Sequence, residues 1–279
     1  MRLATGARVV AEDVALVTRE GPVYTGVDFT ARPGTLTVFQ ADSGGGRSAL
    51  LLTLTGRMRP TSGTVYVDGH ELPRRARRVR RISSLGLMTE VNALDERLRV
   101  SEHLSEAALL RFRPAARGLA DFAMEAADLG ELDRRTLVKE LDALERRRLG
   151  VALALMAEPR LLAVDDVDGG LSDEHQALMW RSLKRLTDAG LTVIATCADA
   201  DALAEVADTD TQGPLPIDQG GDPADAEDPE DTDGAGEVRL SELFGDRAAT
   251  PAAPTTNATN ATNATNAAEG EDGDDRRDR

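Results

Sequence analysis

The stretch Thr37-Val-Phe-Gln-Ala-Asp-Ser-Gly-Gly-Gly-Arg-Ser48-Ala-Leu-Leu-Leu decides the fold, because a glycine-rich turn joins a strand-like run to a helix-like run. Backbone N–H groups in such a turn converge on one point, and the helix start adds partial positive charge there, which favours phosphate. The phosphate-loop pattern is G-x-x-x-x-G-K-[ST]. Gly46 and Ser48 match it, whereas Ala41 replaces the first glycine and Arg47 replaces the lysine. We therefore predict a phosphate-binding loop with an altered cation.

The negative charge is concentrated at the end of the chain. From Asp208 onward there are 19 acidic residues and five arginines, so this part carries −14 of the formal net charge of −16. High net charge with few apolar residues is typical of disorder, and the tripeptide Asn-Ala-Thr is repeated from Asn257. We expect residues 1–206 to form the folded domain and residues 207–279 to form a mostly disordered acidic tail, with a short helix at Glu237–Asp246.

The composition favours an intracellular protein over a secreted or membrane-spanning one. Cys197 is the single cysteine, so no internal disulfide can form. No apolar segment follows Met1-Arg2, as a secretory signal would require. No apolar run approaches the roughly 20 residues needed to cross a bilayer. We expect a cytoplasmic location.

Strand-like and helix-like patterns alternate before the acidic tail. Short strands broken by turns surround the glycine-rich turn, as at Thr64–Val67. Leucines at every third or fourth position predict helices between about residues 100 and 149. Further along, two apolar strands, Leu161–Val164 and Leu191–Thr196, flank an amphipathic helix at Ser172–Asp188. Strand, helix and strand at this spacing predict a parallel α/β sheet.

Two longer segments carry a family resemblance. They are Arg59-Pro-Thr-Ser-Gly-Thr-Val-Tyr-Val-Asp-Gly69 and Leu149-Gly-Val-Ala-Leu-Ala-Leu-Met-Ala-Glu-Pro-Arg-Leu-Leu-Ala-Val-Asp165. With the glycine-rich turn, they resemble the ATP-binding proteins of ATP-binding cassette (ABC) transporters over about residues 8–206. The resemblance implies a P-loop NTPase-type α/β fold. Its parallel sheet core would carry an antiparallel β subdomain and a helical insertion at about residues 93–148.

The resemblance also implies a site for ATP and Mg²⁺. The residues that would bind the nucleotide phosphates are Ser43, Gly44, Gly45, Gly46, Arg47, Ser48 and Ala49. Ser48 and Asp165 match the hydroxyl and the carboxylate that hold the metal in this family. Arg47 keeps a positive charge but replaces a compact ammonium with a larger planar fork. Nucleotide binding should survive this change, whereas positioning of the γ-phosphate should suffer.

The family's catalytic positions, by resemblance, are Asp166, Glu90 and Cys197, and each is altered. Asp166 stands where a glutamate polarises the attacking water, and it is one methylene shorter. A misplacement of roughly 1 Å can cost about 10²-fold in rate. Glu90 replaces the glutamine of the Q-loop, and Cys197 replaces the switch histidine that contacts the γ-phosphate. These changes predict impaired hydrolysis.

The signature motif Leu-Ser-Gly-Gly-Gln is altered as well. Its counterpart is Leu141-Asp-Ala-Leu-Glu145, and in this family the motif binds the γ-phosphate held by the other subunit of a dimer. Asp142 replaces the hydroxyl, so an anion would face an anion. Like unit charges about 4 Å apart repel by about 4 kcal/mol at an effective dielectric constant of about 20. We expect Leu144 to obstruct close approach of the two backbones. The aromatic residue that stacks on adenine has no counterpart near Val14–Arg19, and Tyr24 is offset by several residues.

The resemblance implies partners outside this chain. An ABC ATP-binding subunit drives a separate multi-span membrane permease, and it works as a homodimer or as a heterodimer with another ABC ATPase. Such a protein lies at the inner face of the plasma membrane. The alternative is a catalytically dead pseudo-ATPase that acts as a regulatory or scaffold module on a membrane protein. The arginine run Pro73–Arg81 could bind nucleic acid, but no aromatic residues interleave with it, so a solvated helix face is favoured.

Overall fold

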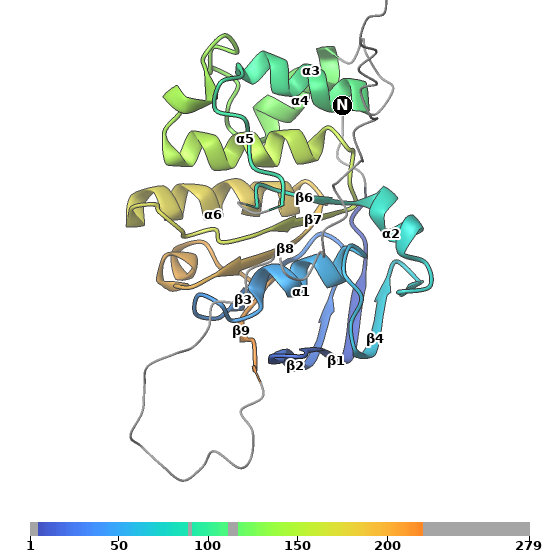
Figure 1. Cartoon of the computed structure of the whole chain (residues 1–279). Coiled ribbons are helices and arrows are strands. Elements are labelled where there is room, and N and C mark those ends of the chain that lie inside the picture. The colour runs from blue at the N-terminus through green and yellow to red at the C-terminus, as the bar shows by residue number, and fades with distance from the viewer. Residues whose placement is uncertain (1–4, 89–90, 111–116, 220–279) are drawn as a thin grey trace, which may run out of the picture. The chain divides into compact units, whose positions relative to one another are not determined.

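Two β-sheets with different strand directions organise the protein (Figure 1). The computed structural model describes residues 5–88, 91–110 and 117–219. One sheet is antiparallel, with strand order β2-β1-β4-β5, and the other has the order β6-β7-β8-β3-β9. Every strand pairing in the second sheet is parallel. The predicted combination of a parallel sheet core and an antiparallel β subdomain is confirmed.

The antiparallel sheet has one buried face. Its strands are β1 (Val9–Thr18), β2 (Gly21–Ala31), β4 (Ser62–Val67) and β5 (His70–Leu72). Buried and exposed residues alternate along much of β2 and at the end of β4, as expected when one face meets solvent. Phe29 on β2 and Phe39 on β3 (Leu36–Gln40) meet edge to face, with ring centroids 4.9 Å apart. This aromatic contact joins the antiparallel sheet to the parallel one.

The parallel sheet is covered on both faces. Its other strands are β6 (Ser83–Leu85), β7 (Leu161–Val164), β8 (Thr192–Cys197) and β9 (Thr211–Pro216). Every residue of β7 and β8 is buried, which explains their continuous apolar runs. Because successive side chains point to opposite faces, Leu161 and Ala163 pack with α1 (Arg47–Leu54) and the antiparallel sheet. Leu162 and Val164 pack with the helices on the other side.

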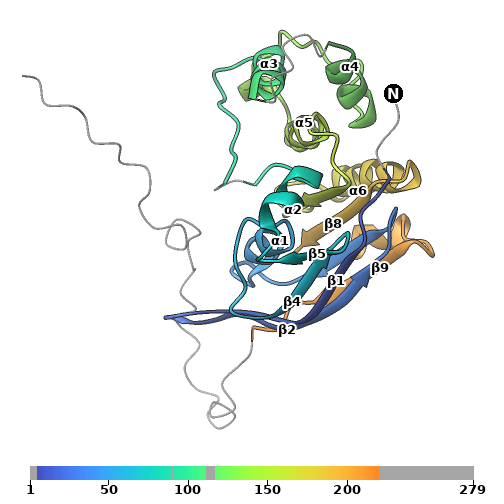
Figure 2. The ribbon, with the colours of Figure 1, turned by 90° about the vertical axis from the view of Figure 1, so that its right-hand side faces the viewer.

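Those helices form the second layer over the parallel sheet. They are α3 (Val100–Leu110), α4 (Arg117–Ala126), α5 (Ala143–Leu155) and α6 (Asp173–Asp188). Figure 2 shows α3, α4 and α5 on the opposite side of the sheet from β1, β2 and β4. Met179 and Trp180 on α6 are fully buried, as the amphipathic pattern predicts. The last of the helices in the predicted insertion, α5, continues past residue 148 to Leu155.

The folded part also continues beyond the boundary predicted at residue 206. A 3₁₀ turn, η2 (Asp201–Glu205), leads to β9, which pairs with β3. After β9, the N–H of Thr25 donates a hydrogen bond to the carbonyl of Asp218, 2.7 Å away. Acidic composition alone therefore placed the boundary too early. The predicted helix at Glu237–Asp246 and the acidic sequence after Gln219 lie outside the described residues.

The arginine run forms an exposed helix surface. It covers α2 (Ala76–Ile82) and the turn before it, and all of its arginine side chains are exposed, whereas Val79 is buried. The favoured interpretation as a solvated helix face agrees with this arrangement. Within the described part of the chain, none of the helices combines the length and apolar character needed to span a bilayer.

Candidate nucleotide-binding site

The glycine-rich turn connects the end of β3 to the first residue of α1. Gly46 caps α1 with φ 74° and ψ 5°, in the left-handed region that favours glycine. A Cβ on Gly46 would lie 2.5 Å from the carbonyl oxygen of Val23. A Cβ on Gly45 would lie 2.6 Å from the Cβ of Ala41 and 2.8 Å from the carbonyl oxygen of Asp42. The backbone therefore runs where side chains cannot fit.

The N–H groups of this turn are not equivalent. The N–H of Gly45 donates to the carbonyl of Asp42 at 2.9 Å and so closes the turn. The first N–H groups of α1 have no acceptor inside the helix, as at any helix start, and are available to an anion. Ser43 is exposed in the turn, whereas the side chain of Ala49 is buried in the core. Of Ala49, therefore, only the backbone can serve a ligand.

Ser48 and Asp165, the two residues expected to share a metal, come together beside the turn. The hydroxyl of Ser48 donates a hydrogen bond to Oδ2 of Asp165. The hydroxyl of Thr196 on β8 donates to Oδ1 of Asp165 at 2.5 Å and accepts from the N–H of Asp166 at 3.0 Å. Thr196, which sequence reasoning missed, thus fixes the orientation of the Asp165 carboxylate.

A hydroxyl next to a carboxylate suits Mg²⁺. This ion prefers oxygen ligands and is usually bound by one or two carboxylates together with substrate phosphates and water. Across residues 5–88, 91–110 and 117–219, no three His, Cys, Asp or Glu side chains form a group that could hold a metal ion by themselves. The donor set of Ser48 and Asp165 therefore fits a metal that is shared with a phosphate.

Asp166 lies between two arginines. Its Oδ1 is 3.2 Å from Nη1 of Arg47, and its Oδ2 is 3.4 Å from Nη2 of Arg147 on α5. The side chains of Arg47 and Arg147 are 13% and 18% exposed, and that of Asp166 is 42% exposed. Among the described residues, the buried Nη1 of Arg47 has no hydrogen-bond partner, so its contact with Asp166 is one of charge only. Asp166 therefore neutralises the cation of the glycine-rich turn.

Asp142 contacts its own helix. Its carboxylate accepts a hydrogen bond from the N–H of Glu145 at 2.7 Å, and the Glu145 carboxylate accepts from the N–H of Asp142 at 3.0 Å. This capping box stabilises the start of α5. Leu144 is 5% exposed and belongs to the core around the helices. The expectation that Leu144 obstructs a partner's backbone is therefore wrong, because its side chain points inward.

Cys197 and Tyr24 are core residues. Cys197 ends β8 with 0% exposure, and its thiol lies 3.9 Å from the carbonyl oxygen of Phe39. Burial, and next the charge of Asp168, raise the pKa of the Cys197 thiol to about 12. Its assignment to the catalytic positions is not supported, because a fully buried thiol cannot reach a bound phosphate. Tyr24 is also fully buried, and its hydroxyl donates to Oγ1 of Thr53 at 2.7 Å, so it cannot stack on adenine. Glu90 lies outside the described residues.

Asp168 is a further residue that sequence reasoning missed. Its buried carboxylate accepts hydrogen bonds from the N–H of Ala198, at 3.1 and 3.0 Å, and from the N–H of Asp199, at 2.7 Å. These bonds join the loop after β7 to the loop after β8. The only sequence signal was an excess of aspartates after Val164, which does not say which of them is buried.

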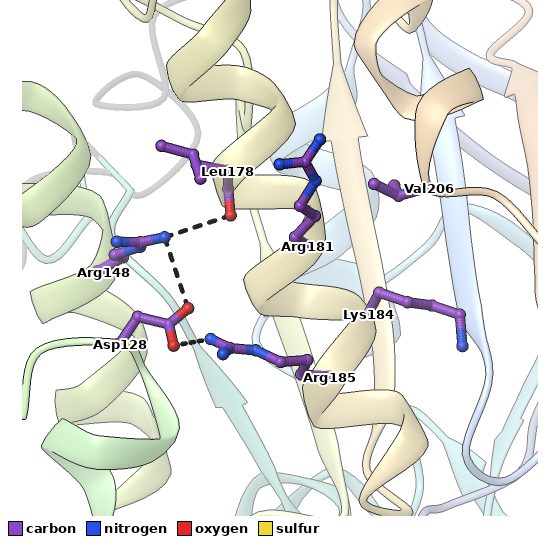
Figure 3. A pocket seen from close by; sticks show the side chains of 7 residues that line it. All are labelled: Asp128, Arg148, Leu178, Arg181, Lys184, Arg185 and Val206. Carbon is purple, nitrogen blue, oxygen red and sulfur yellow. Dashed lines mark hydrogen bonds and ion pairs between the residues drawn. The ribbon is translucent and has the colours of Figure 1, made fainter.

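A cavity of about 550 Å³ has no residue of the glycine-rich turn in its lining (Figure 3). Its lining residues are Asp128, Arg148, Leu178, Arg181, Lys184, Arg185 and Val206. Asp128 pairs with both Arg148 and Arg185, and Arg148 also donates to the carbonyl of Leu178 at 3.3 Å. Arg181 pairs with Glu205, and Lys184 pairs with Asp188 and Asp208. Each cation that lines the cavity is paired with a carboxylate. The ion pair between Asp128 and Arg185 connects the helical insertion to α6.

Comparison with known sequences points to one family. A family model described as "ABC transporter" matches residues 24–168. The daunorubicin resistance ATP-binding protein DrrA3 of Streptomyces coeruleorubidus is 34% identical over 185 residues, which are 64% of this chain and 58% of that protein. Nod factor export ATP-binding protein I of Rhizobium meliloti is 29% identical over 192 residues, which are 67% of this chain and 56% of that protein. The chain thus spans little more than half of each of these two relatives.

Solved structures share the fold. CbiO1 from Clostridium perfringens, described as part of the ABC transporter complex cbiONQ, has a TM-score of 0.65 at 19% identity, covering 76% of this chain and 84% of that one. A bacterial Atm1-family ABC exporter with ATP bound has a TM-score of 0.62 at 18% identity, covering 78% of this chain and 38% of that one.

Proposed function

The chain belongs to the ABC transporter family, and we propose that it is an ATP- and Mg²⁺-binding subunit of an ABC-type transporter in which hydrolysis is impaired. The observation that carries this proposal is the contact between Ser48 and Asp165 at the edge of the glycine-rich turn. A backbone path without side chains, a helix start and this oxygen pair together suit a magnesium-bound polyphosphate.

Each part of the turn has a distinct role in this proposal. The N–H groups at the start of α1 donate hydrogen bonds to the phosphates. Ser48 and Asp165 hold Mg²⁺, which when bound offsets the charge of the phosphates. Thr196 keeps the Asp165 carboxylate oriented through its 2.5 Å hydrogen bond. Arg47 supplies the cation, provided that a phosphate replaces Asp166 as its partner.

Impaired hydrolysis follows from the state of Asp166. A carboxylate can polarise a water only if it is free to accept the water's hydrogen bond. Without nucleotide, both oxygens of Asp166 lie against arginines, at 3.2 and 3.4 Å. When a phosphate replaces it there, the side chain is still one methylene shorter than glutamate, so it is misplaced for holding the attacking water. Cys197 cannot substitute for a histidine, since it is buried. The second candidate, a pseudo-ATPase that binds nucleotide without cleaving it, draws on the same contacts.

The partners of the proposed subunit are a multi-span permease and a second ATP-binding subunit, either another copy or a different ABC ATPase. The names of the relatives support this, because they describe ATP-binding proteins of export and drug resistance. Binding to a permease would hold the protein at the inner face of the plasma membrane. The exposed capping carboxylate of Asp142 would then face the nucleotide of the partner subunit and weaken a dimer closed around ATP.

Nucleotide titration followed by a phosphate-release assay tests this function. Calorimetry with ATP, with and without Mg²⁺, should show binding to the full chain that requires Ser48 and is lost in Ser48→Ala. Ser172→Ala, which changes a helix cap on α6, is the matched control and should bind normally. Absence of adenine nucleotide binding at millimolar concentration would overturn the proposal. Slow phosphate release that is lost in Arg47→Ala supports the impaired ATPase, and no release supports the pseudo-ATPase.

A further inference from the structure

Three consecutive arginines on α5 have different partners. Nη1 of Arg146 lies 3.0 Å from Glu96, and Nη2 of Arg148 lies 3.5 Å from Asp128. Both of these ion pairs lie within the helical insertion, and Arg148 also donates to the carbonyl of Leu178 on α6. Of the three, Arg147 is the one that contacts the segment after β7, where it lies beside the candidate site.

Neighbouring carbonyls hold the guanidinium of Arg147 in place. Its Nη1 donates to the carbonyl of Asp165 at 3.5 Å, and its Nη2 donates to the carbonyl of Gly169. The remaining contact is with the Asp166 carboxylate, 3.4 Å away. Because the carbonyls fix the guanidinium and Asp166 is partly exposed, Asp166 is the contact that another anion can replace.

Arg47 and Arg147 approach the same carboxylate from two helices. Each of them lies beside a different oxygen of Asp166. A terminal phosphate offers oxygen atoms at a similar spacing, with more negative charge, and arginine binds phosphate oxygens well. Asp166 therefore occupies a position suited to a phosphate, between the start of α1 and the side of α5.

We propose that Arg147 is a second phosphate-binding cation, supplied from α5 of the same chain, and that Asp166 holds its place until the terminal phosphate of ATP replaces the carboxylate. This inference rests on the proposed nucleotide binding. It explains how Arg47 and Arg147 can be neutralised in the structure and still serve a ligand. It also means that Asp166 competes with the nucleotide, and that a nucleotide without a γ-phosphate gains less from Arg147.

Equilibrium binding of Mg-ATP and Mg-ADP to the full chain tests the inference. Arginine forms strong charge-assisted hydrogen bonds with phosphate oxygens, so Arg147→Met should weaken ATP binding by about 10- to 100-fold. Binding of ADP should weaken by less than about threefold. Arg146→Met is the matched control on the same helix, and it should leave both affinities within about twofold. Asp166→Asn removes the competing anion and should tighten ATP binding.

A double variant separates direct binding from positioning. If Arg147 contacts the phosphate, Arg147→Met still weakens ATP binding when Asp166 is already asparagine. If Arg147 only positions Asp166, its effect disappears in that background, and the inference is overturned. Arg147→Gln keeps a donor for the carbonyls without the charge, and it replaces Arg147→Met if the latter unfolds.

The remaining outcomes keep the two proposals apart. A wild-type chain that binds no nucleotide at all would overturn the proposed function. A wild-type chain that binds ATP, together with an Arg147→Met variant that binds it equally well, would overturn only the role of Arg147. Equal losses for ATP and ADP would also contradict it, because the γ-phosphate would then play no part.

Discussion

The two sides of the candidate site differ in how far the structure preserves them. On the side that would hold a nucleotide, Gly45 and Gly46 keep a backbone path without side chains, and Ser48 meets Asp165. On the side that would cleave it, Asp166 is paired with arginines and Cys197 is buried. The first side depends on the path of the backbone between β3 and α1. The second side depends on the identity and freedom of individual side chains. A substitution can change these without disturbing the fold.

The largest expected effect is on the stability of the protein, and it tests whether Leu144 in the signature motif is a core residue. Leu144→Ala should lower the free energy of unfolding by about 2–5 kcal/mol, because it leaves a cavity among the buried residues around α5. Urea unfolding of Leu144→Ala and of the exposed Leu109→Ala gives the comparison, and the second variant should change by less than about 0.5 kcal/mol. An unchanged free energy of unfolding for Leu144→Ala would mean that the side chain is not in the core. The expectation that Leu144 obstructs the backbone of a partner subunit would then stand again.

The next effect tests the backbone path of the nucleotide side. Gly46→Ala places a methyl group against the carbonyl of Val23 at a residue with positive φ. We expect a loss of about 1–3 kcal/mol in the free energy of unfolding and a weakening of Mg-ATP binding by about 100-fold or more. Gly118→Ala is the control, because a Cβ there meets nothing within 4 Å. Unimpaired binding by Gly46→Ala would show that the turn does not hold the phosphates.

A smaller effect compares the carboxylate of Asp165 with that of Asp142, which caps α5. In the wild-type chain Mg²⁺ should strengthen ATP binding by about tenfold, and Asp165→Asn should remove that gain by weakening the metal site. Asp142→Asn keeps a good helix cap and should leave the affinity of the isolated chain for Mg-ATP unchanged. Calorimetry at two Mg²⁺ concentrations measures both. The assignment of the metal to the nucleotide-holding side fails if Asp142→Asn, and not Asp165→Asn, alters the dependence on Mg²⁺.

The smallest effect is the pH dependence caused by Cys197. Its pKa rises from 9.0 to about 12 in the folded protein, so the unfolded thiol ionises first as the pH increases. Stability is therefore retained below pH 9.0 and lost progressively toward pH 12, with a loss of about 1 kcal/mol between pH 9 and pH 10. Urea unfolding at pH 8, 9 and 10 should show this slope in the wild type and a smaller slope in Cys197→Ala. Equal slopes would mean that the thiol is not buried.

The sequence patterns predicted that the two sheets form, but they did not predict where the last strand of the domain lies. Fully buried strands such as β7 have unbroken apolar runs, which mark them clearly. β9 lacked such a signal, because it contains Gly213, Pro214 and Pro216, and proline is tolerated in a strand at the edge of a sheet. Without an apolar run to mark β9, the acidic composition after Asp208 placed the predicted boundary before this strand.

The site was predictable where a motif fixes a position and not where only the direction of a side chain matters. Ser48 and Asp165 could be paired in advance because the resemblance assigns both to one metal. Arg147 could not be singled out from its neighbours, since successive residues on a helix point about 100° apart and the sequence does not say which one faces β7. For the same reason the direction of the Leu144 side chain was predicted wrongly. The family's motif has a glycine at this position, so it carries no information on where a larger side chain points.

Asp168 gives the site a mechanical property. Its carboxylate binds the N–H groups of both Ala198 and Asp199, so the segments after β7 and β8 shift as one piece. η2 begins just after this joint, and Glu205 at its end lies 3.5 Å from Arg181 on α6. Because both of these side chains are more than half exposed, this surface ion pair contributes little, and the buried Asp168 carboxylate is the stronger connection between the two loops.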